Sequence, residues 1–199
     1  MDASEQLKEA VLQRTDDIEE DGYHQVILNI MYEHWQDNAG SYKDTLEWYK
    51  NEYGELAQFA ILIGKYNQQV CNGGHIQYFD NGYADGKSGF AKQHDPDSPL
   101  HQTLTVLFSQ SGLRDNTSTA VFNILQEFRI ALDTKEFLEE DVYDEEGNHY
   151  LDRVNNDDYG EVINTHYLSK LDKAYYEICD EFMAILEQYF KEKITGDEK

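Results

Sequence analysis

Apolar side chains recur every three or four residues along most of this chain, which is the spacing of one face of an α-helix. The clearest example lies near the C-terminal end and comprises Leu168, Leu171, Tyr175, Ile178, Phe182, Ile185, Leu186 and Tyr189. One long helix is predicted there, and its outer face carries Asp172, Glu177, Asp180, Glu181 and Glu187. Alternation of period two, which is typical of strands, is confined to short ambiguous pieces near residues 142–151. The periodicity therefore predicts an all-α fold.

Four further stretches carry the same periodicity. Their apolar stripes are Tyr23, Ile27, Ile30 and Met31; Leu56, Phe59, Ala60, Ile63, Tyr66 and Val70; Leu100, Leu104, Leu107 and Phe108; and Val121, Leu125, Phe128 and Leu132. Helices are expected to end at Gly73 and near Gly196, because glycine adopts the conformation that ends a helix at little cost. A helix is expected to begin at Pro99, and Asn116 or Thr117 is expected to cap the following one.

Two segments interrupt the helical pattern. Residues 80–99 are rich in Gly, Asp and Ser, and a long loop is predicted there. Residues 136–161 hold 11 acids and a single base, Arg153, and form an acidic insertion. The chain has only two prolines, so the helices elsewhere can be long. We expect one domain over residues 1–199, a bundle of about six or seven helices with a long loop and an acidic insertion.

The charge balance narrows the classes of partner. The chain has 40 Asp and Glu residues against 16 Lys and Arg, a formal net charge of −24. Direct binding to nucleic acid depends on Lys and Arg that neutralise phosphates, and anionic membranes also attract basic proteins, so both are disfavoured. Disorder is disfavoured as well, because 40% of the residues are hydrophobic and 13% are aromatic. The expected partner is a basic protein.

The sequence also indicates a compartment. The first residues lack the basic and apolar regions of a secretory signal, and no run of 18 apolar residues occurs. Cys71 and Cys179 are too few and too far apart in the sequence for a disulfide framework or a zinc site. A cytoplasmic protein in a reducing environment is expected.

The acids gather in three clusters. The first acidic cluster is Asp16, Asp17, Glu19, Glu20 and Asp21. The second acidic cluster is Asp44, Glu47, Glu52 and Glu55. The third acidic cluster, in the insertion, is Glu139, Glu140, Asp141, Asp144, Glu145, Glu146, Asp157 and Asp158. Acids three or four positions apart on a helix stand roughly 5–6 Å apart, which is comparable with neighbouring phosphates of DNA. The alternative is a set of solvated faces that raise solubility.

Patterns for catalysis and metal binding are weak. No HExxH, P-loop, GxSxG or dinucleotide motif occurs, and EF-hand spacing fails around both Gly147 and Gly160. Cys71 and His75 have the spacing of a nucleophile and its base on one helical turn, but Gly73 and Gly74 between them break that geometry. No catalytic residue, metal site or cofactor is predicted.

The most distinctive segment follows the second helical stretch. It contains Asn72, Gly73, Gly74, Gln77, Tyr78, Phe79 and Asn81. Two glycines allow a sharp turn with positive φ, after which Ile76, Tyr78 and Phe79 can return to the core. The side-chain amides of Asn72, Gln77 and Asn81 can then bond exposed backbone groups. A structural corner is favoured over an active site.

This segment, Asn-Gly-Gly-x-x-Gln-Tyr-Phe-x-Asn, resembles the signature of the DNA-mimic protein family, a bacterial helical domain. Leu171-Asp172 with Tyr175-Tyr176 resembles the Leu-Asp-x-x-Tyr-Tyr step near the C-terminus of that family. The resemblance covers about residues 23–194 and implies a helical fold, a homodimer and a helix-turn-helix transcription factor as partner. His75 departs from the pattern, in which an aromatic such as Phe is commoner, and the acidic insertion is longer than the family core needs. The resemblance implies no catalytic residues.

Four hypotheses about function stay open. The first is a non-enzymatic DNA mimic that binds the basic face of a DNA-binding protein. The second is an immunity or antitoxin-like inhibitor of a basic toxin enzyme. The third is a small hydrolase or metal-dependent enzyme, and the fourth is an acidic scaffold adapted to a salty environment.

Overall fold

The structure is a computed structural model that describes residues 2–37, 42–80, 99–133 and 167–196. These residues form eight helices and no strand, so the predicted all-α class is confirmed. The helices are α1 (Ala3–Leu12), α2 (Thr15–Asp21), α3 (Tyr23–Asp37), α4 (Tyr42–Asp80), α5 (Pro99–Gln110), α6 (Asn116–Asp133), α10 (Tyr167–Tyr176) and α11 (Cys179–Thr195). No helix in these four ranges is both long enough and apolar enough to cross a bilayer.

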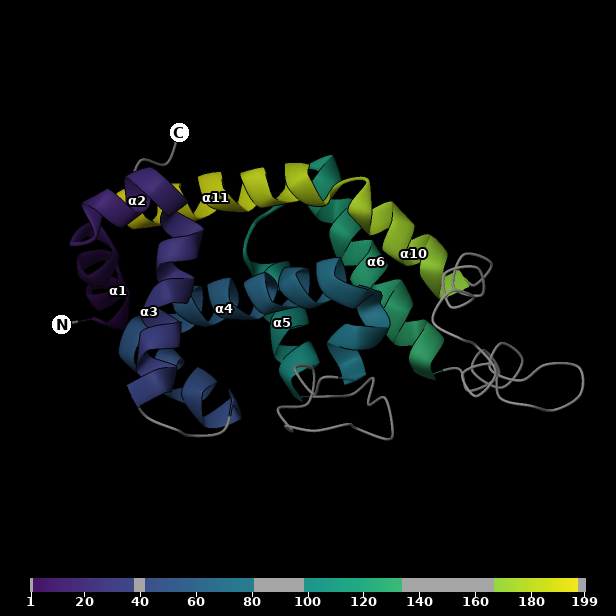
Figure 1. Ribbon diagram of the computed structural model, residues 1–199, viewed down its shortest axis with the longest axis horizontal. Helices are drawn as coiled ribbons and strands as arrows, with labels where there is room; N and C mark the ends of the chain where they lie inside the picture. Colours follow the sequence, from purple (N-terminus) through teal and green to yellow (C-terminus); the bar gives the residue numbers. More distant parts are fainter. Residues whose placement is uncertain (1, 38–41, 81–98, 134–166, 197–199) are drawn as a thin grey trace, which may run out of the picture.

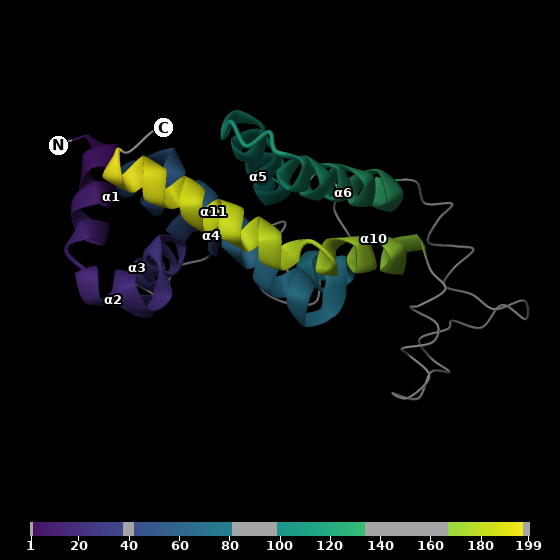
Figure 2. The same ribbon diagram turned by 90° about the horizontal axis from the view of Figure 1, so that it is seen from above.

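Helix α4 forms the centre of the bundle. It runs through the middle of the molecule with α11 along one side, and it contacts α1, α3, α5 and α10 (Figures 1 and 2). Every residue from 57 to 66 is buried, which is the pattern of a helix covered on all sides rather than of one apolar stripe. Gly64 lets α3 approach closely, because a Cβ there would lie 3.0 Å from the side chain of Leu28.

The other predicted stripes pack around this centre. Ile27 and Met31 of α3, Leu104 and Phe108 of α5, and Phe182 and Leu186 of α11 are all buried. Aromatic rings fill much of the core. For example, the ring of Phe108 stacks on that of Phe182, with centroids 5.8 Å apart. Burial of this many large apolar side chains supplies the main driving force for folding.

Glycines bend α4 at two places. Gly73 leaves the helical conformation and Gly74 has φ +75°, so the expected helix end at Gly73 is confirmed as a sharp break. A second break at Gly54, with φ +85°, was not predicted. Beyond it the chain turns so that the first segment of α4 and the buried segment point in different directions (Figure 1).

The prediction of one long C-terminal helix is wrong. The chain leaves the helix at Glu177–Ile178, and α10 and α11 are separate helices. Because Leu171, Tyr175 and Phe182 stay in step across the break, the periodicity does not reveal it. The bend lets α10 pack on α4 and α6 while α11 reaches α1 and α3.

The helix ends are largely as expected, with one correction. α5 begins at Pro99, and Gly196 has φ +76° at the end of α11. The cap of α6 is Asp115 rather than Asn116 or Thr117, since its carboxylate accepts a hydrogen bond of 2.8 Å from the backbone N–H of Ser118.

Candidate functional site

The first acidic cluster lies on α2, at an outer corner of the molecule (Figure 1). All five of its carboxylate side chains are exposed, whereas Ile18 turns inward and packs against the core. None of the five forms an ion pair with any residue that the structure describes. The nearby cation, Arg14, holds the carboxylate of Glu33 on α3 through both guanidinium N–H groups. α2 therefore presents a dense group of carboxylates to solvent.

The second acidic cluster is divided by the bend at Gly54. Asp44, Glu47 and Glu52 are exposed on the first segment of α4. Glu55 follows the bend, its carboxylate lies 3.6 Å from the ammonium group of Lys50, and it is one of the residues that line a groove described below. α2 lies toward one end of α3, and the first turns of α4 lie toward the other end (Figure 1). α3 is about 22 Å long.

Several predicted residues lie outside the part of the chain that the structure describes. They are Asn81 and the third acidic cluster, that is Glu139, Glu140, Asp141, Asp144, Glu145, Glu146, Asp157 and Asp158. The same holds for most of the predicted loop at residues 80–99.

The distinctive glycine segment meets α10 at a buried polar contact. The carboxylate of Asp172 accepts hydrogen bonds from the backbone N–H of His75, at 2.8 Å, and from the imidazole Nδ1, at 2.5 Å. The other ring nitrogen, Nε2, lies 2.6 Å from the hydroxyl of Tyr66. Burial lowers the pKa of His75 below its ordinary value, so the ring is neutral at pH 7 and Nε2 accepts from the hydroxyl. We call this contact between α4 and α10 the motif junction.

Two tyrosines of α10 extend the motif junction. The hydroxyl of Tyr175 donates to the side-chain oxygen of Asn67 at 2.6 Å. The hydroxyl of Tyr176 donates to the backbone carbonyl of Val70 at 2.8 Å. Asp172 thus joins the two sequence motifs, while Tyr175 and Tyr176 bind residues of α4 that lie just before the first motif.

Glycine is required at the centre of the motif junction. Gly74 has φ +75°, and a Cβ there would lie 2.4 Å from a carboxylate oxygen of Asp172. Of the other motif residues, Tyr78 returns to the core as predicted, and the side-chain amide of Gln77 donates to that of Gln69 at 3.1 Å. Asn72 is exposed. These contacts give the segment a structural role, as a corner between α4 and α10.

Two acids that were assigned to the outer face of the C-terminal helix instead bind other helices. Asp172 turns inward to His75, as described above. Glu187 accepts hydrogen bonds of 2.8 and 2.9 Å from the backbone N–H groups of Tyr23 and His24, and so caps the first turn of α3. The Leu-Asp-x-x-Tyr-Tyr motif pointed to Asp172, but no sequence signal pointed to Glu187.

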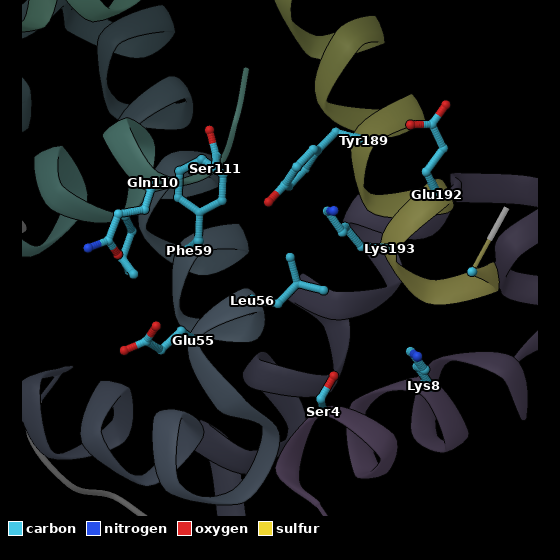
Figure 3. Close-up of a pocket in the computed structure, with 12 residues that line it drawn as sticks. Ser4, Lys8, Glu55, Leu56, Phe59, Gln110, Ser111, Tyr189, Glu192 and Lys193 are labelled. Carbon is cyan, nitrogen blue, oxygen red and sulfur yellow. The ribbon is translucent and has the colours of Figure 1, made fainter. Parts of the chain in front are cut away.

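A groove lies between α1, α4, α5 and α11, and it was not predicted (Figure 3). Its volume is about 470 Å³. Phe59 and Tyr189 supply apolar surface, and the ammonium group of Lys193 lies 5.8 Å from the centre of the Tyr189 ring. Both signs of charge occur among its lining residues, which include Lys8, Lys193, Glu55 and Glu192. The lining contains neither histidine nor cysteine.

The geometry expected of a hydrolase is not found at Cys71 and His75. Both ring nitrogens of His75 are engaged, by Asp172 and Tyr66, so the ring does not face the thiol as a base. Partial burial raises the pKa of Cys71 to about 11, which disfavours the thiolate. Within the described ranges, no group of three His, Cys, Asp or Glu side chains has the arrangement of a metal site.

Comparison with known proteins adds no relative. No family model, no curated protein and no solved structure matches the chain. The resemblance to the DNA-mimic family therefore rests on its two motifs, which the fold joins at the motif junction.

Proposed function

We propose that this protein is a non-enzymatic acidic binding protein that acts as a DNA mimic and occupies the basic DNA-binding surface of a transcription regulator. The observation that carries the proposal is the first acidic cluster, in which five exposed carboxylates stand on a helix of seven residues. Neighbouring acids on this helix are roughly 5–6 Å apart, so they offer arginine side chains a row of charged acceptors.

The position of two of these acids, at the C-terminal end of α2, argues against a role in stability. Glu20 and Asp21 lie in the last turn of α2, where the helix dipole disfavours negative charge, and that turn has no basic residue. With no ion pair to a described residue, the five carboxylates also repel one another. An arrangement that costs the folded state free energy is reasonable where the charge serves binding.

The mechanism is electrostatic. A cluster of negative charge attracts a basic partner over a distance of about a Debye length. This attraction accelerates association at low ionic strength. Close pairing of carboxylates with guanidinium groups then holds the complex. DNA would compete for the same basic surface, since most of its contacts to proteins are made through phosphates.

The experiment is capture of partners from lysate at low salt, followed by elution with duplex DNA. A variant with Asp16→Asn, Asp17→Asn, Glu19→Gln, Glu20→Gln and Asp21→Asn removes the first acidic cluster. The matched control removes five exposed acids scattered over the rest of the described chain, with Glu5→Gln, Glu9→Gln, Glu127→Gln, Glu177→Gln and Asp180→Asn. We expect the wild-type protein to capture a basic DNA-binding protein, and duplex DNA to displace that partner. The control variant should still capture it, whereas the cluster variant should not.

Other results distinguish the remaining hypotheses. A basic enzyme that stays bound in excess DNA would favour the immunity or antitoxin-like inhibitor. Capture of no basic partner at low salt would overturn the proposal and leave the acidic scaffold.

A further inference from the structure

Cys71 and Cys179 are neighbours in the folded protein, although 107 residues separate them in the sequence. Cys71 lies on α4 just before the break at Gly73 and Gly74, and Cys179 is the first residue of α11. Both are free thiols, Cys71 exposed and Cys179 partly exposed, and the nearby Cys179 contributes to the raised pKa of Cys71.

Hydrogen bonds around the two thiols position them. The thiol of Cys71 lies 3.4 Å from the side-chain oxygen of Asn67, which also accepts from the hydroxyl of Tyr175 at 2.6 Å. The thiol of Cys179 lies 3.5 Å from the backbone carbonyl of Tyr176. The hydroxyl of Tyr176 donates to the backbone carbonyl of Val70, the residue before Cys71. These contacts hold the stretch of α4 before Gly73 against α10 and the bend that follows it, next to the two thiols.

We propose that Cys71 and Cys179 form a reversible oxidation site, at which hydrogen peroxide or a small disulfide such as oxidised glutathione converts the two thiols into an intramolecular disulfide. This inference goes beyond the proposed function and does not depend on it. It uses residues of α4 and α11, whereas the first acidic cluster lies on α2.

The chemistry balances with either oxidant. With peroxide, one thiolate attacks an oxygen and becomes a sulfenic acid, and the second thiol displaces water from it to form the S–S bond. Two thiols are oxidised by two electrons, and the peroxide is reduced to two molecules of water. With oxidised glutathione, one thiolate forms a mixed disulfide and releases one glutathione thiol, and the second thiol then releases the other.

The surroundings set the rate and the consequence. Desolvation of the Cys71 sulfur by neighbouring protein atoms and the nearby Cys179 raise the pKa of this thiol to about 11, so oxidation is slow at pH 7 and faster at higher pH. The exposure of Cys71 gives a small oxidant access. The cross-link would tie the stretch of α4 just before Gly73 to the start of α11, near the contact between Asp172 and His75. It would thereby resist separation of these helices.

The test uses the full chain at low protein concentration with oxidised glutathione at pH 8.5, followed by intact mass, thiol counting and peptide mapping without reduction. We expect the loss of two hydrogen masses and of both reactive thiols, and a peptide that links Cys71 to Cys179. Reduction with dithiothreitol should reverse all three. The melting temperature of the oxidised protein should rise by on the order of 5 °C, because the closed loop is long.

The single variants Cys71→Ser and Cys179→Ser are the controls. Each should gain one glutathione, keep that adduct and show no rise in melting temperature. The proposal would be overturned if the wild-type protein gained two glutathione adducts, formed disulfides only between molecules, or kept both thiols unreacted.

Discussion

One carboxylate oxygen of Asp172 accepts hydrogen bonds from both the backbone N–H and the imidazole Nδ1 of His75, at 2.8 and 2.5 Å. Both residues belong to the motifs that resemble the DNA-mimic family, and the contact joins α4 to α10. The side chain of His75 is fully buried and that of Asp172 is 13% exposed. Because water replaces such partners poorly, the contact is important for the stability of the fold.

Replacement of Asp172 should therefore destabilise the protein. Asp172→Ala leaves two buried donors of His75 without their acceptor and should lower the free energy of unfolding by about 2–4 kcal/mol. Asp172→Asn keeps one acceptor oxygen and should cost less. Urea unfolding measures both effects, with Glu177→Ala, an exposed acid near the end of α10, as the control expected to change stability by less than about 0.5 kcal/mol. Equal effects of Asp172→Ala and Glu177→Ala would contradict this role.

Gly74 offers a comparison between backbone strain and steric conflict. Gly74→Ala places a Cβ 2.4 Å from the carboxylate of Asp172 at φ +75°. Gly112 has a similar φ of +84° with no atom within 4 Å, so Gly112→Ala tests the backbone cost alone. We expect a loss of about 1 kcal/mol for Gly112→Ala and of more than about 2 kcal/mol for Gly74→Ala in thermal or urea unfolding. Similar losses at the two sites would show that Asp172 moves aside without cost.

Stability should fall as the pH is lowered below about 6.5. Burial lowers the pKa of both His75 and His24 in the folded protein, so the unfolded chain binds more protons in this range. Their contribution is fully present above the unfolded pKa and is lost as the pH falls toward the lower folded values. Each group contributes a slope of up to about 1.4 kcal/mol per pH unit.

Urea midpoints between pH 7.5 and 5 measure this dependence. His75→Phe introduces the aromatic residue that the family pattern favours and removes one of the two titrations, so its slope should be smaller than that of the wild type. The control is His34→Phe. His34 is only partly buried, and its ring stacks on that of Trp48 with centroids 3.4 Å apart. A wild-type stability that does not change between pH 7.5 and 5 would refute the prediction.

The two ends of α2 should respond oppositely to the removal of charge. Glu20→Gln with Asp21→Asn relieves repulsion at the C-terminal end of the helix dipole and should raise stability by about 0.3–1 kcal/mol at low salt. Asp16→Asn with Asp17→Asn removes charge from the first turn and should lower stability by a similar amount. Thermal unfolding at low and high salt checks both, and the differences should shrink as salt screens the charges. The same sign of change at both ends would contradict a dipole effect.

Much of the secondary structure was predictable because its signals are local. The breaks at Gly73 and Gly196, the start of α5 at Pro99 and the burial of Tyr78 all follow from residue type and spacing. The bend between α10 and α11 was missed, because Tyr175 and Phe182 keep helical spacing across it and neither glycine nor proline marks it. The break at Gly54 was missed although a glycine marks it.

The candidate site also combines residues that the sequence could predict with residues that it could not. The five acids of the first acidic cluster could be recognised in the sequence, and the fold places them all in solvent. The acids of the C-terminal helix were assigned to an outer face by the same reasoning, yet Asp172 binds His75 and Glu187 caps α3. A carboxylate at a polar position of a helix has the same sequence pattern whether it meets water or the N–H groups of another helix.

The sequence by itself determined that this chain is helical, where glycine and proline end several helices, and that its net charge is −24. These properties depend on residue type and on spacings within one helix. Only the tertiary structure decided that Asp172 meets His75, that Glu187 reaches Tyr23 and that Cys71 lies beside Cys179. Such contacts depend on how the buried segment of α4 is covered by distant helices, and packing across the core has no counterpart in local spacing.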